Sequence, residues 1–278
     1  MPELPEVETI KNAVQQTLKD AVFLEVQINN PCLRKPVQAD LPQILQNAKI
    51  IQYRRIAKYL ILNLDNGYSL ILHFGMSGTL RLSKNRGKIL KHDHLVFATN
   101  KGYMIYNDPR RFGLCLYERT DTLEKNPLFR GIGIDPFDDA LTARWFKKNL
   151  ENRVTPIKQV LLDQKIICGI GNIYASEALY LAGILPTRSA SSLTLKECEN
   201  LLQGIRKTLS LAVQAGGSTL KDYRKPDGSL GYFQNSHCVY NKTGQTCPNC
   251  ICDVKKTGGI KKIIQSGRST YFCATKQR

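Results

Sequence analysis

Residues 1–18 of the chain read MPELPEVETIKNAVQQTL. Apolar side chains recur in this stretch at spacings of three and four, at Val7, Ile10, Val14 and Leu18. That period predicts a helix with one buried face. Pro2 and Pro5 suit only the first turn of such a helix, because proline lacks the N–H that later turns need. The sequence therefore predicts a helix from Glu3 to Leu18 that opens the fold with an acidic end.

After this helix, apolar and polar side chains alternate, which is the period of a strand with one buried face. Residues 22–28 follow this pattern. The turn sequences Asp65-Asn66-Gly67 and Asn100-Lys101-Gly102 each separate two such segments, and they predict hairpins over residues 59–73 and 94–106. Several short strands with turns between them predict a β-sandwich or barrel, which we place at residues 1–133.

From Asp138 onward the periodicity is helical. Short helices are predicted over residues 156–163 and 172–182, and Thr194 with Glu197 forms a capping box for a helix that ends at Gly216-Gly217. Residues 216–236 are rich in Gly, Ser, Asp and Pro, which predicts a mobile loop. We therefore expect an α+β protein with a helical domain at residues 134–236, this loop included, and a basic tail at residues 237–278.

Composition limits the classes of function. The chain has 278 residues with 40 Lys and Arg against 23 Asp and Glu, a net charge of +17. This excess favours a polyanionic partner, although a solvated basic surface is the simpler alternative. The apolar runs are only a few residues long, so we expect no membrane span. The acidic start is unlike a signal peptide, and nine cysteines without one indicate a reducing, cytoplasmic setting.

The first residues also carry potential chemistry. If Met1 is removed, Pro2 presents a secondary α-amine, which is far less basic than a lysine and can attack an electrophilic carbon to form an imine. Glu3 is the adjacent acid, and Glu6 lies one helical turn further on. An ordinary capped helix start would have the same appearance, and on these residues alone it is the simpler interpretation.

Three further motifs are each ambiguous when taken singly. Gly169 to Glu177 places an asparagine and backbone amides at a helix start, which suits a phosphate or a packed corner. Asp108 to Gly113 carries two arginines and a phenylalanine, which suit a base-stacking wedge or an exposed turn. Cys247 and Cys250 have zinc-knuckle spacing, but after Cys273 the position expected to hold a fourth cysteine is Lys276.

Taken together, these segments resemble bacterial formamidopyrimidine-DNA glycosylases over nearly the whole chain. The resemblance rests on seven motifs in the family's order: residues 1–9, 58–60, 73–78, 91–94, 108–113, 169–177 and, in the C-terminal part, 216–222 with 231–233. The related endonuclease VIII shares the catalytic opening but differs at Leu4 and lacks the Arg-Arg-Phe wedge. Leu4 and Phe112 therefore favour the formamidopyrimidine branch.

The resemblance implies a β-sandwich that carries the catalytic helix, followed by a helical domain with a helix–two-turn–helix motif and a zinc-finger hairpin. It implies that Pro2 attacks C1′ of the damaged nucleoside while Glu3 supplies acid catalysis at the sugar. It further implies that Lys58 contacts phosphate and donates a proton during β-elimination, that Glu6 positions the sugar and the helix start, and that Arg268 grips the phosphate at the lesion.

The resemblance also implies how the duplex is held. The extruded base leaves a gap that Met76, Arg110 and Phe112 would fill, and residues 217–224 would close over the base. Other DNA-contacting positions carried over from the family are His73, His92, Arg153, Lys158 and Asn172. One Zn²⁺ per chain is expected on Cys247, Cys250 and Cys273, with Cys252 or Cys238 as substitute fourth ligand in place of Lys276; a hairpin without metal is the alternative.

These inferences predict a monomeric, bifunctional DNA glycosylase and abasic-site lyase of base excision repair. Its partner would be double-stranded DNA containing oxidised purines or abasic sites, cleaved by β,δ-elimination at the bacterial nucleoid. An endonuclease VIII-like enzyme for oxidised pyrimidines, a lesion-binding protein without turnover and a regulatory DNA binder are the alternatives. Pro2 and Glu3 argue for an enzyme, because a protein that only binds DNA has no need of either.

Overall fold

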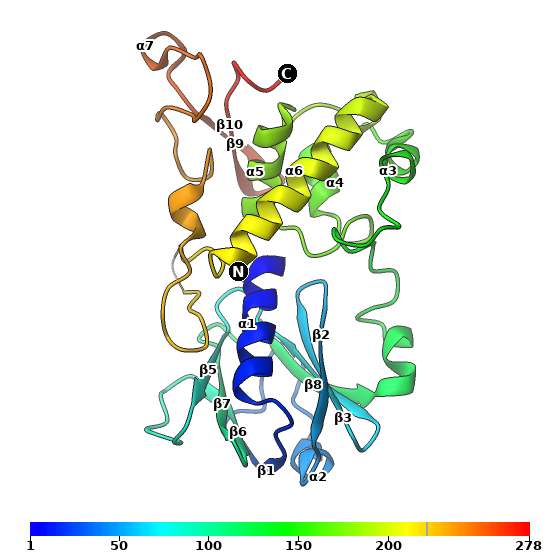
Figure 1. Cartoon of the computed structure of the whole chain (residues 1–278), viewed down its shortest axis with the longest axis vertical. Coiled ribbons are helices and arrows are strands. Elements are labelled where there is room, and N and C mark those ends of the chain that lie inside the picture. The colour runs from blue at the N-terminus through cyan, green and yellow to red at the C-terminus, as the bar shows by residue number, and fades with distance from the viewer. Residues whose placement is uncertain (221) are drawn as a thin grey trace. The chain divides into compact units, whose positions relative to one another are not determined.

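A computed structural model describes residues 1–220 and 222–278. Lys221, which belongs to the predicted loop at residues 216–236 (the recognition loop), lies outside the described residues. The chain forms two compact units (Figure 1). The first comprises Met1–Arg130 and Val213–Gln234, and the second comprises Gly131–Ala212 and Asn235–Arg278. Among the described residues, no helix combines the length and the hydrophobicity that crossing a membrane requires.

The first unit is a β-sandwich with a helix packed on it. One sheet has the strand order β1-β6-β7-β5 and the other has the order β2-β3-β4-β8. The strands are β1 (Phe23–Ile28), β2 (Ile50–Ile56), β3 (Tyr59–Leu64), β4 (Tyr68–His73), β5 (Thr79–Ser83), β6 (Asp93–Thr99), β7 (Gly102–Asn107) and β8 (Leu114–Arg119). The helices are α1 (Leu4–Thr17), α2 (Leu41–Leu45) and the 3₁₀ turn η1 (Thr120–Lys125). All neighbouring strands pair antiparallel.

Helix α1 confirms the predicted N-terminal helix. Its buried stripe of Val7, Ile10 and Val14 joins the inward residues of both sheets in one core. Figure 1 shows α1 in blue alongside the sandwich, where it packs against β2, β3 and β5. The apolar face of the helix is therefore buried against the sandwich.

Both predicted hairpins are present. Strands β3 and β4 have the predicted bounds, whereas β6 begins one residue earlier than predicted and β7 is one residue longer at each end. The prediction did not specify β2, β5 and β8, although these strands complete the two sheets. Their segments show weaker alternation, with partly buried residues on both faces of β2 and β8.

The second unit is helical with a terminal hairpin. It contains α3 (Ala143–Leu150), α4 (Ile157–Leu162), α5 (Asn172–Ala182), the 3₁₀ turn η2 (Ala190–Ser192) and most of α6 (Leu195–Gln214). The predicted capping box is present, since Glu197 accepts the Thr194 N–H at 2.8 Å and Thr194 accepts the Glu197 N–H at 3.2 Å. The turn η3 (Phe233–Ser236) precedes the tail, and its first two residues belong to the first unit. The tail itself contains the single turn α7 (Val254–Thr257) and the hairpin of β9 (Lys261–Gln265) and β10 (Arg268–Phe272).

Two assignments differ from the predicted domains. Most of the 216–236 segment belongs to the first unit, because Tyr223 is buried in the sandwich core and the Pro226 carbonyl accepts the Leu82 N–H at 2.9 Å. The basic tail is not separate, because Tyr180 of α5 shares a hydrophobic cluster with Cys247, Ile260 and Tyr271. Neither contact can be predicted from residue periodicity, because each joins residues that are far apart in the sequence.

The burial of α1 gives a stability prediction. Ile10→Ala should destabilise the first unit by about 2–5 kcal/mol, because it removes a fully buried side chain from the interface between helix and sandwich. Leu24→Ala is the control, since Leu24 is 48% exposed on β1. Denaturant unfolding followed by circular dichroism would measure both. Equal midpoints for the two variants would contradict the assigned packing of α1.

Candidate active site and metal centre

The start of α1 is buried, although it is rich in charge. Glu3 and Glu6 are 3% and 1% exposed, and Pro2 beside them is also buried. The Glu6 carboxylate accepts the Glu3 N–H at 2.8 Å and, through its other oxygen, the Ser218 N–H at 2.8 Å. Acidic groups are favourable at a helix N-terminus, where the backbone amides point outward. Glu6 thus fixes both the helix start and the beginning of the recognition loop.

Lys58 lies in the two-residue turn that joins β2 and β3. The preceding residue, Ala57, has a φ of +52°, which is strained for a residue with a Cβ. Lys58 is itself largely buried. The turn therefore presents this lysine from a constrained backbone.

His73 lies at the end of β4, opposite Tyr59 of β3, with the two ring centroids 4.7 Å apart. Its Nδ1 accepts the Gly75 N–H at 3.0 Å, which leaves the proton of the neutral ring on Nε2. Burial lowers the pKa of His73 to about 3, and the positive charges of Arg34 and Lys58 lower it further in the same direction. A neutral Nε2–H group can donate a hydrogen bond to a phosphate but cannot titrate near neutral pH.

The residues of the predicted wedge are exposed, in contrast to the groups just described. Met76 and Phe112 are 43% and 46% exposed, and the Arg110 guanidinium lies 4.7 Å from the centroid of the Phe112 ring. The two side chains are carried by adjacent loops, since the Gly75 backbone lies against the Phe112 backbone. The arrangement suits insertion between bases.

Asp108 organises the wedge turn. Its side chain is fully buried, and its two oxygens accept the Ser77 hydroxyl at 2.7 Å and the Gly113 N–H at 2.8 Å. Gly75, with a φ of +56°, allows the two loops to touch, because a Cβ there would lie 2.4 Å from the Phe112 carbonyl carbon. The loops that carry Met76 and Phe112 are therefore held together through backbone contacts.

His92 lies beside this turn rather than in it. Its carbonyl accepts the Asp108 N–H at 3.1 Å, and its ring packs edge-on against His94 at 6.1 Å. The ring is half-buried. This position supports the turn and leaves part of the imidazole accessible.

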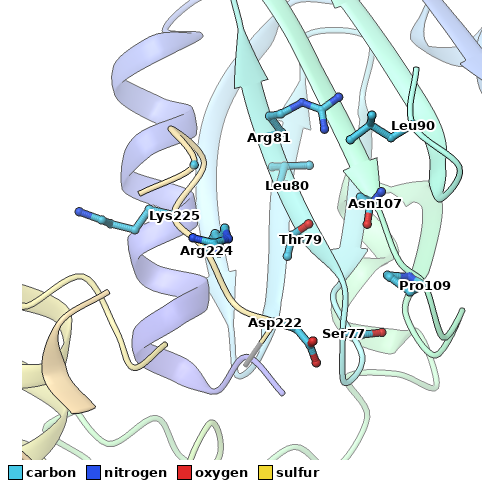
Figure 2. A pocket seen from close by; sticks show the side chains of 11 residues that line it. Ser77, Thr79, Leu80, Arg81, Leu90, Asn107, Pro109, Asp222, Arg224 and Lys225 are labelled. Carbon is cyan, nitrogen blue, oxygen red and sulfur yellow. The ribbon is translucent and has the colours of Figure 1, made fainter. Parts of the chain in front are cut away.

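A cavity of about 400 Å³ lies next to Ser77 in the first unit, a size typical of small-molecule sites. Figure 2 shows Asp222 and Ser77 at one end of the cavity and Arg81 and Leu90 at the other, while the Lys225 side chain points away. Arg81 is held by buried Asp93 at 3.0 Å. The lining mixes apolar surface with donors and acceptors, which suits a planar polar ring.

In the second unit, Lys158 and Asn172 join three elements. Lys158 is 1% exposed, and its Nζ donates to Asn172 Oδ1 at 2.6 Å, Thr270 Oγ1 at 2.7 Å and the Ser269 carbonyl at 3.2 Å. Asn172 Nδ2 donates to the Ser269 carbonyl at 2.9 Å and to the Tyr240 hydroxyl at 3.2 Å. This burial does not favour the direct DNA contact predicted for Lys158, because its ammonium is enclosed by protein acceptors.

Arg268 and Arg153 are exposed, as contacts to DNA require. Arg268 begins β10, directly after the turn of Ser266 and Gly267, whose positive φ values suit a tight hairpin. Arg153 follows α3, and its Nε donates to the Asn149 carbonyl at 2.8 Å. The nearby Lys158 network ties the strand of Arg268 to α4 and α5.

Glu177 of α5 anchors the segment that leads into the tail. Its buried carboxylate accepts the N–H groups of Cys238, Val239 and Tyr240 at 2.6, 3.0 and 2.7 Å. Burial raises the pKa of Glu177, and these three hydrogen bonds oppose that rise. The anchored segment presents Tyr240 to Asn172.

Four cysteines gather where zinc was predicted: Cys247, Cys250, Cys252 and Cys273, whose sulfurs all lie within 4.8 Å of one another. The Cys247–Cys252 and Cys247–Cys273 sulfur pairs are 3.2 and 3.3 Å apart, and the Cys250–Cys273 and Cys252–Cys273 pairs are 3.7 and 4.0 Å apart. Zn–S bonds of about 2.3 Å in a tetrahedron place sulfurs roughly 3.8 Å apart. The cluster therefore fits a tetrahedral thiophilic ion.

The fourth member of the cluster is Cys252, and the other candidate, Cys238, is not part of it. Lys276 turns to the ring of Tyr180, with its Nζ 4.1 Å from the ring centroid. The neighbouring Gln277 accepts the Cys273 N–H at 2.8 Å and donates to the Ile184 carbonyl at 2.9 Å. The chain end is thus held by packing and hydrogen bonds.

Several organising residues had no assigned role in the sequence prediction. Asp108 stood within a quoted motif, but its role depends on partners in the wedge turn. Glu177 likewise stood in a motif, and nothing in the sequence connects it to residues 238–240. Tyr240 and Arg34 gave no signal in spacing or composition.

Comparison with known proteins matches both units to the same glycosylase family. Residues 1–115 match the family model described as the formamidopyrimidine-DNA glycosylase N-terminal domain, and residues 132–224 match the H2TH domain of that glycosylase. The formamidopyrimidine-DNA glycosylase of Rhodospirillum rubrum is 44% identical over 281 residues, and the alignment covers both chains completely. That of Rickettsia massiliae is 44% identical over 278 residues, covering all of this chain and 97% of the relative.

Solved structures of this family also resemble the chain over nearly its whole length. The Lactococcus lactis Fpg mutant G226P, in complex with DNA containing Fapy-dG, is 32% identical with a TM-score of 0.90, and the match covers all of both chains. The MutM (Fpg) protein of Thermus thermophilus is 34% identical with a TM-score of 0.87, covering 99% of this chain and 98% of the other. The chain therefore belongs to the formamidopyrimidine-DNA glycosylase family.

Proposed function

We propose that this protein is a bifunctional DNA glycosylase and abasic-site lyase that removes oxidised purines, chiefly 8-oxoguanine and formamidopyrimidines, from double-stranded DNA. It would act as a monomer in base excision repair, at the nucleoid in the bacterial cytoplasm. The observation that carries the proposal is the buried start of α1, where Pro2 lies beside the enclosed carboxylates of Glu3 and Glu6. Relatives in this family have been solved with DNA containing a lesion or an abasic site.

The chemistry begins at Pro2 once Met1 has been removed. Its nitrogen forms a bond to C1′ of the damaged nucleoside, the bond from C1′ to the base breaks with its electron pair leaving on the base, and the proton lost from the proline nitrogen neutralises the departing base. Glu3 donates a proton to the sugar ring oxygen, so that the ring opens and the Pro2–C1′ bond becomes an imine. The imine then acidifies C2′, and β,δ-elimination cleaves the strand on both sides of the sugar.

Lys58 and His73 would handle phosphate in the first unit. Lys58 supplies positive charge and a proton during elimination, while neutral His73 donates its Nε2–H. In the second unit, Asn172, Tyr240 and exposed Arg268 would bind phosphate, with Lys158 holding Asn172 and the hairpin strand in place. Arg153 and His92 would contact the backbone further along the duplex.

Extrusion of the base leaves a gap that Met76, Phe112 and Arg110 would fill. Their exposure and the rigid Asp108 turn support this role. The cavity beside Ser77 is our candidate for the site of the extruded base, since its lining includes Asp222 and Arg224 of the recognition loop. We retain the predicted organisation of a catalytic sandwich and a helix–two-turn–helix domain, with the recognition loop assigned to the sandwich.

We further propose that the four-cysteine cluster binds one Zn²⁺ per chain through Cys247, Cys250, Cys252 and Cys273. The sulfur separations fit tetrahedral coordination, and four thiolates match the ligand number of structural zinc. Bound zinc would cross-link the loop of Cys247 to the end of β10. The ion would stabilise the hairpin that carries Arg268 and would take no part in the reaction.

Imine formation at Pro2 gives the first test. Borohydride should trap the protein covalently on a duplex containing 8-oxoguanine, and Pro2→Gly should slow trapping strongly because it replaces the secondary amine. Glu3→Gln should abolish base release while leaving duplex affinity nearly intact. Efficient trapping by protein that mass spectrometry shows still carries Met1 would refute the mechanism, because an amide nitrogen is not nucleophilic.

The zinc site gives a second test. Protein purified without chelator should contain close to one zinc per chain, and Cys252→Ser should lower both this content and resistance to chelators. Cys238→Ser is the matched control and should retain full zinc, since Cys238 lies outside the cluster. Lys276→Cys should not raise the zinc content. Loss of zinc in the Cys238 variant but not in the Cys252 variant would refute the proposal that Cys252 is the fourth ligand.

His73 predicts a pH dependence of stability. Its pKa of about 3 in the folded protein lies below the unfolded value of about 6.5, so the unfolded state binds the proton first. Stability should therefore fall as pH decreases from about 6.5 towards 3, and this group contributes roughly 2–3 kcal/mol of that loss by pH 4.5. His73→Asn should flatten the curve, measured by urea unfolding at pH 7 and 4.5. Parallel curves for the two proteins would argue against a buried neutral His73.

A further inference from the structure

We infer that Arg55 is a positioning residue for Lys58, and that with Glu8 it sets the geometry between the catalytic helix and the β2–β3 turn. The inference rests on the proposed function, in which Lys58 acts in strand cleavage. Arg55 lies on β2 and its side chain is only 10% exposed. None of the family features used above assigns it a role.

The Arg55 guanidinium bridges two segments. Its Nε donates to Glu8 Oε2 of α1 at 2.8 Å, and its Nη1 donates to the Ala57 carbonyl at 3.1 Å. Glu8 is also bound by Lys11 Nζ at 2.5 Å, one turn along α1. A single planar group thus ties the helix that begins at Leu4 to the turn that holds Lys58.

The bond to Ala57 has a specific consequence for Lys58. Ile56 pairs with Tyr59, so Ala57 and Lys58 form a two-residue hairpin loop. Of these two, only Ala57 has a positive φ, a pattern typical of type II′ turns, which favour glycine at that position. The carbonyl that Arg55 binds belongs to the Ala57–Lys58 peptide, whose plane directs the Lys58 side chain.

Without the hydrogen bond from Arg55 to the Ala57 carbonyl, we expect the turn to relax to a less strained conformation. A residue with a Cβ is strained at a φ of +52°, and such strain persists only where surrounding contacts enforce it. Arginine suits this task because its fork offers two donors in fixed relative geometry, which lysine cannot reproduce. Arg55 therefore holds a strained turn in the conformation that presents Lys58.

The adjacent arginine provides the matched control. Arg54 is on the same strand but is 34% exposed, and its nearest acidic partner, Glu124, lies at 3.9 Å. Changing Arg54 or Arg55 to methionine removes the same charge and preserves the aliphatic stem. Only the Arg55 change removes the bridge between α1 and the turn.

The experiment uses full-length protein under single-turnover conditions on a duplex containing 8-oxoguanine, with base release and strand cleavage scored separately. Arg55→Met should slow strand cleavage by about tenfold or more, because small displacements of a catalytic group have large effects on rate. Duplex affinity should change little, Arg54→Met should match the wild type, and Arg55→Lys should recover part of the loss.

A double-mutant cycle separates positioning from general structural damage. If Arg55 acts through Lys58, Arg55→Met should cause no further loss in a Lys58→Ala background. An equal loss in both backgrounds, or wild-type cleavage by the Arg55 variant, would overturn the inference. If Arg55→Met does not fold, Glu8→Gln replaces it in the cycle with the same expected dependence on Lys58.

The same data distinguish this inference from the proposed function. Absence of any covalent trapping in the wild type would refute the function itself. Full cleavage by Lys58→Ala would refute the role of Lys58 and the inference together. Impaired cleavage by Lys58→Ala with unimpaired cleavage by Arg55→Met would refute only the role of Arg55.

Discussion

The buried carboxylate of Glu6 is the constraint on which the candidate site of the first unit depends. One oxygen holds the Glu3 amide at the start of α1, and the other holds the Ser218 amide at the start of the recognition loop, 212 residues away in sequence. Glycine suits position 217, because its φ of +82° is strained for other residues and a Cβ there would lie only 3.0 Å from the Glu6 side chain. The helix that carries Pro2 and the loop expected to enclose the base therefore share one anchor.

The second unit is organised by the same kind of interaction with the opposite charge. The Lys158 ammonium draws together Asn172 at the start of α5 and the β10 residues Ser269 and Thr270. Glu177, on the same helix as Asn172, holds residues 238–240 through three backbone amides. In both units a buried ionic group is satisfied mainly by backbone and neutral polar atoms, which fixes segments that are distant in sequence.

Features that depend on residues close together in the sequence could be predicted, whereas features that depend on distant residues could not. The helix of Val7, Ile10 and Val14 and the hairpin around Asp65-Asn66-Gly67 were predicted because periodicity and turn chemistry are local. The contacts that group most of the 216–236 segment with the sandwich could not be predicted, because only the fold shows Tyr223 in the sandwich core. Cys252 remained one of two candidates for the fourth ligand, because only the fold shows that it joins the cluster and that Cys238 does not. Arg55 gave no signal, because its partners come from a helix and a turn.

The functional groups differ in exposure according to the task proposed for them. The groups proposed to do chemistry or to hold other groups, Glu3, Glu6, Lys58 and Lys158, are buried. Their geometry is set before substrate arrives, so little reorganisation is required at the reaction step. The groups proposed to enter the duplex, Met76, Arg110 and Phe112, remain exposed. Exposure of such apolar side chains is tolerable on a turn that cannot collapse inward, and the buried Asp108 carboxylate supplies that rigidity through the Gly113 amide and the Ser77 hydroxyl.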